Sequence, residues 1–331
     1  MKNQGTIYVV MPAYNVEKFI AMAFDSLRAQ TYPHWKCLCM NDGSTDKTWQ
    51  IMQEYARKDK RILIFRQENK GLTKTMNILL NKVKGPYLAF VDSDDCIHPQ
   101  MFEILLHTLL TTKSDVSECQ FIRFFDSPEK QVLSRIDIEK AQPELLTDMS
   151  IFLNHKTSEG SWINKWNKLY LWHKVKDIRF SEELSYEDDY FYSSLIHDTI
   201  QTKALIDLPL YFYRRNPNGA CGRVNWTKYQ TAGINRIRLS YDYFIKGNRV
   251  PPERRDAFMS DLAQDAYRMI VRKPLKKTKD LTFFRNAALA VRNYVSAGII
   301  DTKYLSLKQR IHLWLVAHDC YRLSRWMAKL T

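Results

Sequence analysis

Short apolar runs alternate with amphipathic segments along the first part of the chain. Runs rich in β-branched and aromatic residues predict strands, and apolar residues spaced three and four apart predict helices. The predicted strands are residues 7–11, 35–40, 62–65 and 87–91, with predicted helices at 17–30, 46–57 and 73–83. This alternation indicates an α/β fold with a mostly parallel, Rossmann-like sheet covered by helices.

Beyond residue 213 the pattern changes, and only helical spacing remains. The predicted helices there are residues 225–246, 253–272, 281–297 and 306–330. We therefore predict an α/β domain at residues 1–215 and a helical C-terminal region at residues 216–331. The length of 331 residues suits one large or two modest domains of about 100–200 residues.

Polar turns follow three of the predicted strands. They read Pro12-Ala13-Tyr14-Asn15, Asn41-Asp42-Gly43-Ser44-Thr45-Asp46 and Asp92-Ser93-Asp94-Asp95. In a parallel sheet, ligands bind beyond the carboxyl ends of the strands. We therefore expect the three turns to converge on one crevice.

The third of these turns holds three carboxylates in four residues. Repulsion among Asp92, Asp94 and Asp95 favours a bound positive charge. A hard divalent cation is usually held by one or two carboxylates together with substrate phosphates, which suits this turn. The alternative is a solvated acidic turn that caps the following helix, because short motifs match often.

Two other patterns suit a nucleotide site and a third suits a general base near an acceptor hydroxyl, although each alone also fits an ordinary turn or helix start. Asp42 is a candidate acceptor for a base N–H group. The stretch Asn69-Lys70-Gly71 opens onto a predicted helix, whose N-terminus favours anions, and Lys74 adds positive charge. Glu187-Asp188-Asp189 offers a carboxylate as general base, or simply a helix start stabilised by negative charge.

In their order along the chain, these stretches resemble family 2 glycosyltransferases with the GT-A fold, of the bacterial lipopolysaccharide and capsule polysaccharide type. The resemblance covers roughly residues 5–215. The matching stretches are Val9-Val10-Met11-Pro12-Ala13-Tyr14-Asn15, Asn41-Asp42-Gly43-Ser44-Thr45-Asp46, Asn69-Lys70-Gly71-Leu72, Asp92-Ser93-Asp94-Asp95, Trp166-Asn167-Lys168-Leu169-Tyr170 and Tyr186-Glu187-Asp188-Asp189.

The resemblance implies a role for each candidate residue. Asp94 would bind Mg²⁺ or Mn²⁺ that bridges the diphosphate, and Asp92 would contact the ribose or the metal's shell. Asp42 would contact the base, and Asp188, with Glu187 beside it, would be the catalytic base. The other implied nucleotide-sugar-binding residues are Pro12, Ala13, Tyr14, Asn15, Asn69, Gly71, Lys74 and Ser93.

The implied reaction is an inverting transfer from a nucleotide-diphosphate sugar, a UDP-hexose or UDP-N-acetylhexosamine, to an acceptor hydroxyl. The acceptor would be a growing surface glycan such as lipopolysaccharide core, O-antigen or capsule. Two residues depart from the family pattern. Asn41 stands where the family often has aspartate, and Met76 where it often has arginine. Lys74 is the candidate substitute for that arginine.

Positive charge gathers in the last third of the chain. The net charge is +14, and residues 214–331 hold 24 of the 50 basic but only 8 of the 36 acidic residues. Such a region meets phosphate, whether of a membrane lipid, a phosphorylated glycan or nucleic acid.

The predicted helix at 306–330 has a pattern typical of a helix that lies on anionic lipid, and the uneven charge favours the membrane. Packing of this helix on the catalytic domain is the alternative. The apolar stripe of this helix consists of Leu313, Val316, Cys320, Leu323, Met327 and Leu330. The opposite, basic side consists of His318, Arg322, Arg325 and Lys329.

No apolar run approaches the ~18–20 residues that span a bilayer, and no signal-peptide pattern opens the chain. We expect a cytoplasmic protein, peripheral on the cytoplasmic face of the inner membrane, with a lipid-linked glycan acceptor and no nucleic acid partner. The six cysteines contain no CxxC pair, which favours reduced core thiols over a zinc site.

Two other hypotheses compete with the sugar transferase. A nucleotidyl or phospho-sugar transferase would need a glycine-rich phosphate loop after the first strand, which Pro12-Ala13-Tyr14-Asn15 does not provide. A non-enzymatic glycan- or nucleic-acid-binding protein would use the basic C-terminal region, but it leaves the acidic turns unexplained.

Overall fold

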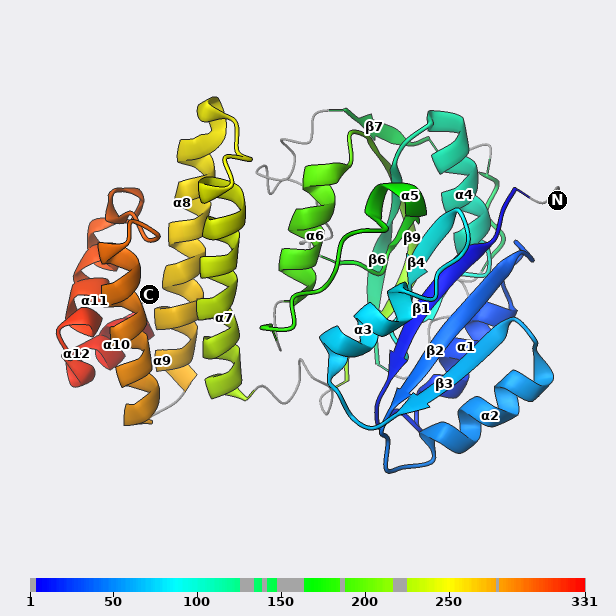
Figure 1. Cartoon of the computed structure of the whole chain (residues 1–331), viewed down its shortest axis with the longest axis horizontal. Helices are drawn as coiled ribbons and strands as arrows, with labels where there is room; N and C mark the ends of the chain where they lie inside the picture. Colours follow the sequence, from blue (N-terminus) through cyan, green and yellow to red (C-terminus); the bar gives the residue numbers. More distant parts are fainter. Residues whose placement is uncertain are drawn as a thin grey trace. The chain divides into compact units, whose positions relative to one another are not determined.

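The computed structural model describes residues 4–125, 134–138, 142–147, 164–184, 188–216, 225–277 and 280–330 (Figure 1). The chain forms two compact units. The first comprises Met1–Ser181 and Tyr192–Gly222, and the second comprises Glu182–Phe191 and Arg223–Thr331. Among the described residues, all strands belong to the first unit.

One sheet forms the centre of the first unit. Its strands are β1 (Ile7–Ala13), β2 (Trp35–Asp42), β3 (Ile62–Gln67), β4 (Tyr87–Phe90), β5 (Cys96–Ile97), β6 (Val116–Phe124), β7 (Glu144–Leu146), β8 (Lys168–Leu171) and β9 (Lys203–Arg214). The order is β3-β2-β1-β4-β8-β6-β9-β5, and β7 pairs with β9. Strands β3, β2, β1 and β4 are parallel, as are β6 and β9, whereas β8, β5 and β7 are antiparallel to their partners. The predicted α/β fold with a mostly parallel sheet is confirmed.

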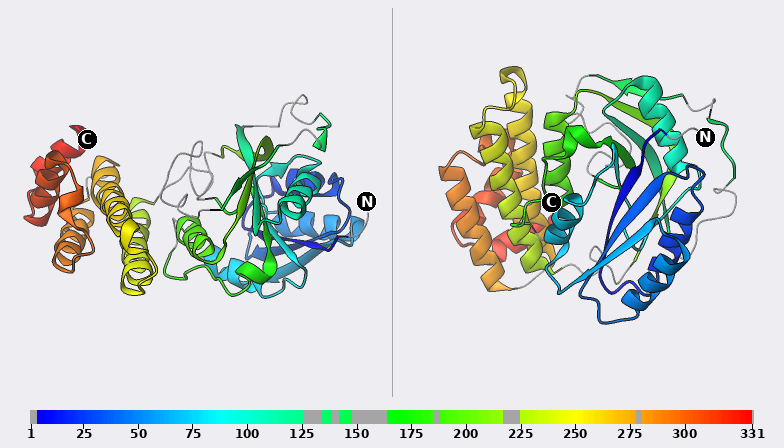
Figure 2. Two further views of the ribbon diagram at one scale, coloured as in Figure 1. Left: turned by 90° about the horizontal axis from the view of Figure 1, so that it is seen from above. Right: turned by 45° about the vertical axis from the view of Figure 1, so that its right-hand side comes forward.

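The helices of this unit are α1 (Ile20–Arg28), α2 (Thr48–Lys58), α3 (Leu72–Leu80), α4 (Met101–Thr112), α5 (Trp172–Val175) and the greater part of α6 (Asp188–Thr199). Figures 1 and 2 show α1 and α2 on one face of the sheet and α3 on the other. The connecting helices change from one face to the other because the chain moves outward from β1 through β2 to β3 and then returns past β1 to form β4. The strand order therefore reverses between β1 and β4, which is where open α/β sheets bind ligands.

Burial explains why β1 and β4 lie at the middle of the sheet. Ile7, Val9, Val10 and Met11 of β1 are fully buried, as are Leu88, Ala89 and Phe90 of β4. Strands covered on both faces need such continuous apolar runs rather than an alternating pattern. The core thus holds the two strands that carry the first and third polar turns.

The second unit is helical. Its helices include α7 (Trp226–Ser240), which continues as η5 (Tyr241–Lys246), and α8 (Arg255–Ala266), which continues through η7 (Tyr267–Arg272) into α9 (Lys273–Lys277). Helices α10 (Leu281–Ser296), α11 (Leu307–Ala317) and α12 (Tyr321–Leu330) follow. Within the described part of the chain, we find no helix with both the length and the apolar character needed to cross a membrane.

The prediction of one helix over residues 306–330 is wrong. The chain breaks between α11 and α12, where Asp319 adopts a left-handed conformation with φ 58°. Aspartate tolerates this conformation, which cannot continue a right-handed helix. The predicted apolar stripe is divided as a result, because Leu313, Val316 and Met327 pack inside the unit whereas Leu323 and Leu330 are exposed.

Candidate active site

The turn after β1 is joined to the turn after β2. Pro12 and Ala13 end β1 and lie beside Met40 and Asn41 of β2. The Asn15 side-chain oxygen accepts a hydrogen bond from the Thr45 amide at 2.9 Å, and the Asn15 amide donates to Ser44 Oγ at 3.0 Å. Asn15 has φ 51°, and Tyr14 before it is half exposed.

Asp42 organises the loop that leads into α3. Its buried carboxylate accepts hydrogen bonds from Gln67 Nε2 at 2.7 Å, the Lys70 amide at 2.8 Å and the Gly71 amide at 2.9 Å. These bonds occupy three of the roughly four acceptor positions of a carboxylate, so one remains for a ligand. The residue predicted to contact the base therefore also shapes the loop around it.

Gly71 directly precedes α3, and its amide reaches Asp42 at the end of β2. It has φ 85°, a conformation that favours glycine, and the space around it is open. The neighbouring Asn69 is exposed, and its backbone approaches Gly43 so closely that a Cβ on Gly43 would lie 2.7 Å from the Asn69 nitrogen. Lys74 is exposed on the first turn of α3.

Met76, at the position where the family often has arginine, is fully buried in the core. It therefore supplies no polar contact to a nucleotide. Asn77, next in the chain, bonds the backbone of Phe180 through both ends of its amide and is occupied in holding the fold.

The acidic turn after β4 is clamped by β9. The Tyr211 hydroxyl accepts from the Asp92 amide at 3.1 Å and donates to Asp95 Oδ2 at 2.7 Å. The Arg214 amide donates to Asp95 Oδ1 at 2.7 Å, and its side chain donates to the Asp94 carbonyl at 2.8 Å. Asp95 is thus a structural anchor, which leaves Asp92 and Asp94 as the candidate ligands.

A lysine that the sequence analysis did not single out lies at this turn. Lys165 Nζ is 3.4 Å from Asp92 Oδ1, and the lysine side chain is only 3% exposed. Trp166 beside it stacks on Tyr211, with ring centroids 4.3 Å apart. The sequence signal for Lys165 was its position next to the matching stretch 166–170. No local pattern indicated that its partner, Asp92, lies 73 residues earlier in the chain.

The electrostatics of the turn are those of crowded carboxylates. Burial, followed by the nearby Asp92 charge, raises the pKa of Asp94 to about 6. Burial likewise raises the pKa of Asp95 well above its usual value, and Asp92 and Asp94 add to the effect. Negative charge in the turn is therefore only partly balanced by protein groups, so a cation would be favoured there.

The donor set of this turn fits a divalent cation that is shared with a substrate. Asp92 and Asp94 offer carboxylate oxygens, which Mg²⁺ and Mn²⁺ prefer. Among the described residues, no group of three or more His, Cys, Asp or Glu side chains forms a complete metal cage. Two carboxylates plus diphosphate oxygens are the usual arrangement for Mg²⁺ in such sites.

The structure brings together most, but not all, of the predicted residues. Because β2, β1 and β4 are adjacent and parallel, their carboxyl ends place Asp42, Pro12, Ala13, Asp92, Ser93 and Asp94 along one edge of the sheet. Ser93 is buried beneath the acidic turn. Asp188 begins α6, but its side chain and the whole of Glu187 lie outside the described residues.

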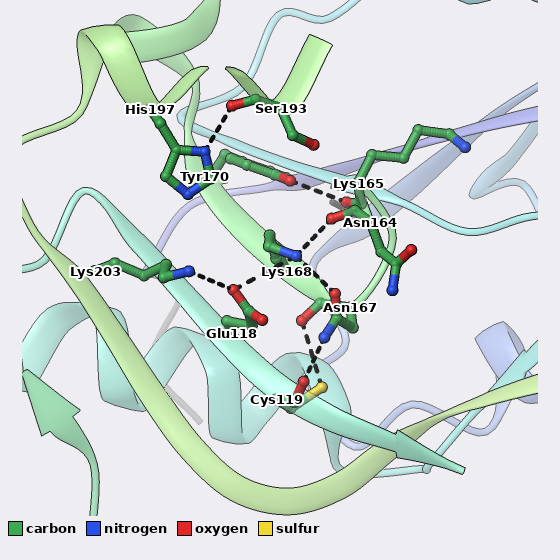
Figure 3. A network of polar contacts seen from close by, with 10 residues as sticks. All are labelled: Glu118, Cys119, Asn164, Lys165, Asn167, Lys168, Tyr170, Ser193, His197 and Lys203. Atoms are coloured by element: carbon green, nitrogen blue, oxygen red, sulfur yellow. Dashed lines mark hydrogen bonds and ion pairs between the residues drawn. The ribbon is translucent and has the colours of Figure 1, made fainter. Parts of the chain in front are cut away.

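A buried charge network anchors the loop that carries Lys165 (Figure 3). The Glu118 carboxylate on β6 lies 2.9 Å from Lys203 Nζ on β9 and 3.4 Å from Lys168 Nζ on β8. Lys168 Nζ also donates to the Asn164 carbonyl, and the Tyr170 hydroxyl donates to the Lys165 carbonyl at 3.0 Å. The Lys165 side chain itself extends away from this network (Figure 3).

Comparison with known proteins identifies the family. The model of glycosyl transferase family 2 matches residues 8–165. Glycosyltransferase GlyA of Streptococcus pneumoniae is 32% identical over 226 residues, which cover 67% of this chain and 32% of GlyA. EpsJ of Bacillus subtilis, an uncharacterized glycosyltransferase, is 30% identical over 216 residues, 64% of this chain and 62% of EpsJ. The chain thus spans about a third of GlyA and less than two thirds of EpsJ.

Solved structures share the fold. S. aureus TarS 1–349 in complex with UDP-GlcNAc has a TM-score of 0.73 at 18% identity, over 98% of this chain and 90% of that one. The mannosyltransferase PcManGT of Pyrobaculum calidifontis, in complex with GDP-Man and Mn²⁺, has a TM-score of 0.52 at 15% identity, over 99% of this chain and 85% of that one. With its mostly parallel sheet and the acidic turn after β4, the chain belongs to glycosyl transferase family 2 and has the GT-A fold.

Proposed function

We propose that this chain transfers a sugar from a UDP-hexose or UDP-N-acetylhexosamine to an acceptor hydroxyl. The observation that carries the proposal is the meeting of three turns, which hold Tyr14, Asp42 and Asp94, at the carboxyl ends of β1, β2 and β4. The TarS complex with UDP-GlcNAc supports UDP as the nucleotide.

Each turn would contact a different part of the donor. Tyr14 and Asn15 border the nucleoside, and Asp42 holds the loop that precedes α3 while it offers one acceptor position to the base. The N-terminus of α3 and Lys74 present positive charge to the diphosphate. Asp92 and Asp94 would hold Mg²⁺ or Mn²⁺, which when bound offsets charge on the departing nucleoside diphosphate.

Asp188 is the proposed general base. A carboxylate near the acceptor would take the hydroxyl proton as that oxygen attacks the anomeric carbon opposite the leaving group. One displacement of this kind inverts the anomeric centre. Glu187 is adjacent in sequence and is proposed to assist at the acceptor side.

The proposed acceptor is a growing bacterial surface glycan on a lipid carrier, such as lipopolysaccharide core, O-antigen or capsule. The basic C-terminal part of the chain supports this choice, since the 24 basic and 8 acidic residues of 214–331 would attract an anionic membrane. The chain would then work at the cytoplasmic face of the inner membrane.

A thermal-shift titration with UDP and Mn²⁺ tests the donor site. We expect UDP and Mn²⁺ together to raise the Tm more than the sum of their separate effects, because each ligand completes the site of the other. Asp94→Asn should abolish this synergy, since it removes a ligand charge.

The matched control is Asp177→Asn. Asp177 is an exposed aspartate just after α5. Helix α5 follows β8, whose last residue pairs with the first residue of β4. Asp177 therefore lies near the start of β4, at the opposite end of this strand from the acidic turn. The control should keep the synergy. Stabilisation of the wild type by DNA and not by UDP with Mn²⁺ would instead support a nucleic-acid-binding protein.

Asp188→Asn separates chemistry from binding. We expect it to lower the rate of sugar transfer by about 10²–10⁴-fold, the usual contribution of a general base. The affinity for UDP with Mn²⁺ should stay within the error of the wild type. Near-normal turnover in this variant would remove Asp188 from the mechanism.

A further inference from the structure

A groove runs between α10 and α11 in the second unit. Its volume is about 630 Å³, within the range of ~300–1,000 Å³ typical of ligand pockets. Val291 and Val295 of α10 form one wall, and Ile311 and Trp314 of α11 form the other. Arg292 and Arg310 also line the groove; Arg292 is paired with Asp319 at 3.2 Å, so Arg310 supplies its unneutralised positive charge.

The apolar walls continue onto the outer surface. Leu307, Ile311 and Trp314 are 73%, 46% and 56% exposed, and their spacing of four and three places them on one stripe of α11. Val295 on the facing helix is 40% exposed. Monomeric proteins rarely leave such contiguous apolar surface open unless it binds something.

Helix α12 adds a second exposed stripe. Leu323, Trp326 and Leu330 are all more than half exposed, at spacings of three and four. Lys308 Nζ donates to the Leu330 carbonyl at 2.9 Å, so the start of α11 lies against the end of α12. Both helices are at the end of the second unit farthest from α7 (Figures 1 and 2). The hairpin thus presents two exposed indoles, the side chain that favours membrane interfaces.

The charge on this hairpin selects the partner. Residues 303–330 contain six basic side chains and one acidic side chain, Asp319. Arg310 donates only to the carbonyls of Lys303 and Leu305 within the described chain, so no carboxylate neutralises it there. A second copy of the same face would meet like charge, whereas anionic lipid gains about 1 kcal/mol per basic residue near the surface.

We propose that the groove between α10 and α11 takes a hydrocarbon chain of an anionic lipid at a membrane surface. Ile311 and Trp314 insert beside the chain, and Arg310 meets the lipid phosphate. The proposal deepens the membrane contact put forward above, but it does not depend on the transfer reaction. It also places the contact on the outward stripes, because the stripe expected from a single long helix is partly buried.

Vesicle binding of a double variant tests the groove. The variant carries Ile311→Ser and Trp314→Ser, and the matched control is Leu289→Ser on α10, which is 53% exposed and does not line the groove. Co-sedimentation is measured with vesicles of equal parts phosphatidylglycerol and phosphatidylcholine. We expect the double variant to bind about tenfold more weakly or worse, since it loses two exposed apolar side chains that the lipid would cover. The control should bind as the wild type does.

Chain-brominated lipid reports where the hydrocarbon lies. Bromines on the acyl chains should quench the tryptophan fluorescence of the wild type more than that of Trp314→Phe. The reason is that Trp314 of the wild type would lie beside the acyl chain in the groove. If the double variant and the wild type bound vesicles equally, and only salt weakened the binding, charge attraction alone would explain it and the proposed lipid site in the groove would be wrong. A dimer seen by light scattering and lost in the double variant, without vesicle binding, would assign the groove to a second copy and overturn the proposal.

UDP binding in the same variants keeps the two proposals apart. If the double variant loses vesicle binding but keeps the Tm rise with UDP and Mn²⁺, the lipid site stands whatever the fate of the transferase assignment. If UDP and Mn²⁺ show no synergy in the wild type, the proposed transferase function is contradicted, while the proposed lipid site in the groove is unaffected.

Discussion

At the scale of single residues, Lys165 controls the charge of the acidic turn. Its ammonium group is nearly buried and lies 3.4 Å from Asp92, whose side chain is 27% exposed. An ammonium in this position would compete with a metal ion for the same carboxylate. It also lowers the net negative charge that Asp94 and Asp92 present together.

Replacing Lys165 with methionine should tighten divalent-ion binding. Removal of one positive charge near the site favours a cation by roughly 1 kcal/mol or more, or about fivefold in affinity. The measurement is the Mn²⁺ concentration at which UDP binding is half-maximal. Lys165→Arg keeps the charge and should behave as the wild type. If both variants shift the Mn²⁺ requirement equally, packing rather than charge is the role of Lys165.

At the scale of elements, the close approach of two loops shapes the proposed donor site. Gly43 follows β2 with φ 75°, and its missing side chain lets the Asn69 backbone lie against it. A Cβ there would meet backbone atoms, which cannot move aside as the end of a flexible side chain can. The loop that Asp42 holds would have to shift.

Gly43→Ala should therefore weaken UDP binding by about tenfold or more, since small misplacements in a site are costly. The control is Gly298→Ala in the turn after α10, which has φ 70° but open space around it. Both changes pay about 1–2 kcal/mol for a left-handed alanine. Calorimetric titration with UDP separates them, and equal affinities in the two variants would refute the role of loop contact.

Local patterns were enough to predict the strand ends and not enough to predict their partners. Buried runs followed by polar turns identify where β1, β2 and β4 end, because the transition lies within a few residues. Lys165 reaches Asp92 across 73 positions, and its position follows from a loop held by Lys168 and Tyr170. The break at Asp319 was missed for a related reason, since helical spacing continues across it while the backbone reverses.

At the scale of the whole molecule, charge and burial are distributed differently in the two units. The first unit carries the acidic turn and a buried network of one carboxylate between two lysines. The second carries most of the excess positive charge on exposed helices. Function at the membrane would depend on the exposed charges, whereas acid stability depends on the buried groups.

His197 of α6 should make the protein acid-sensitive. Burial, and after it the charge of Lys203, lower the pKa of His197 to about 3, against an ordinary value of 6.5. The unfolded chain therefore binds a proton below pH 6.5 that the folded chain refuses, so stability is full above that pH and falls as the pH drops toward 3. Between pH 6.5 and 5 the loss is at most about 2 kcal/mol of unfolding free energy.

The variant His197→Asn tests this, because its amide retains a donor for the Ser193 carbonyl that Nδ1 contacts at 2.6 Å. We expect the Tm of the variant to fall less than that of the wild type between pH 6.5 and 5. Part of the fall should persist, since burial also lowers the pKa of His312 in the second unit to about 4. The control His173→Asn changes an exposed histidine on α5 and should follow the wild type. Parallel Tm curves for all three proteins would show that the buried network around Glu118 tolerates a protonated His197, and that acid sensitivity arises elsewhere.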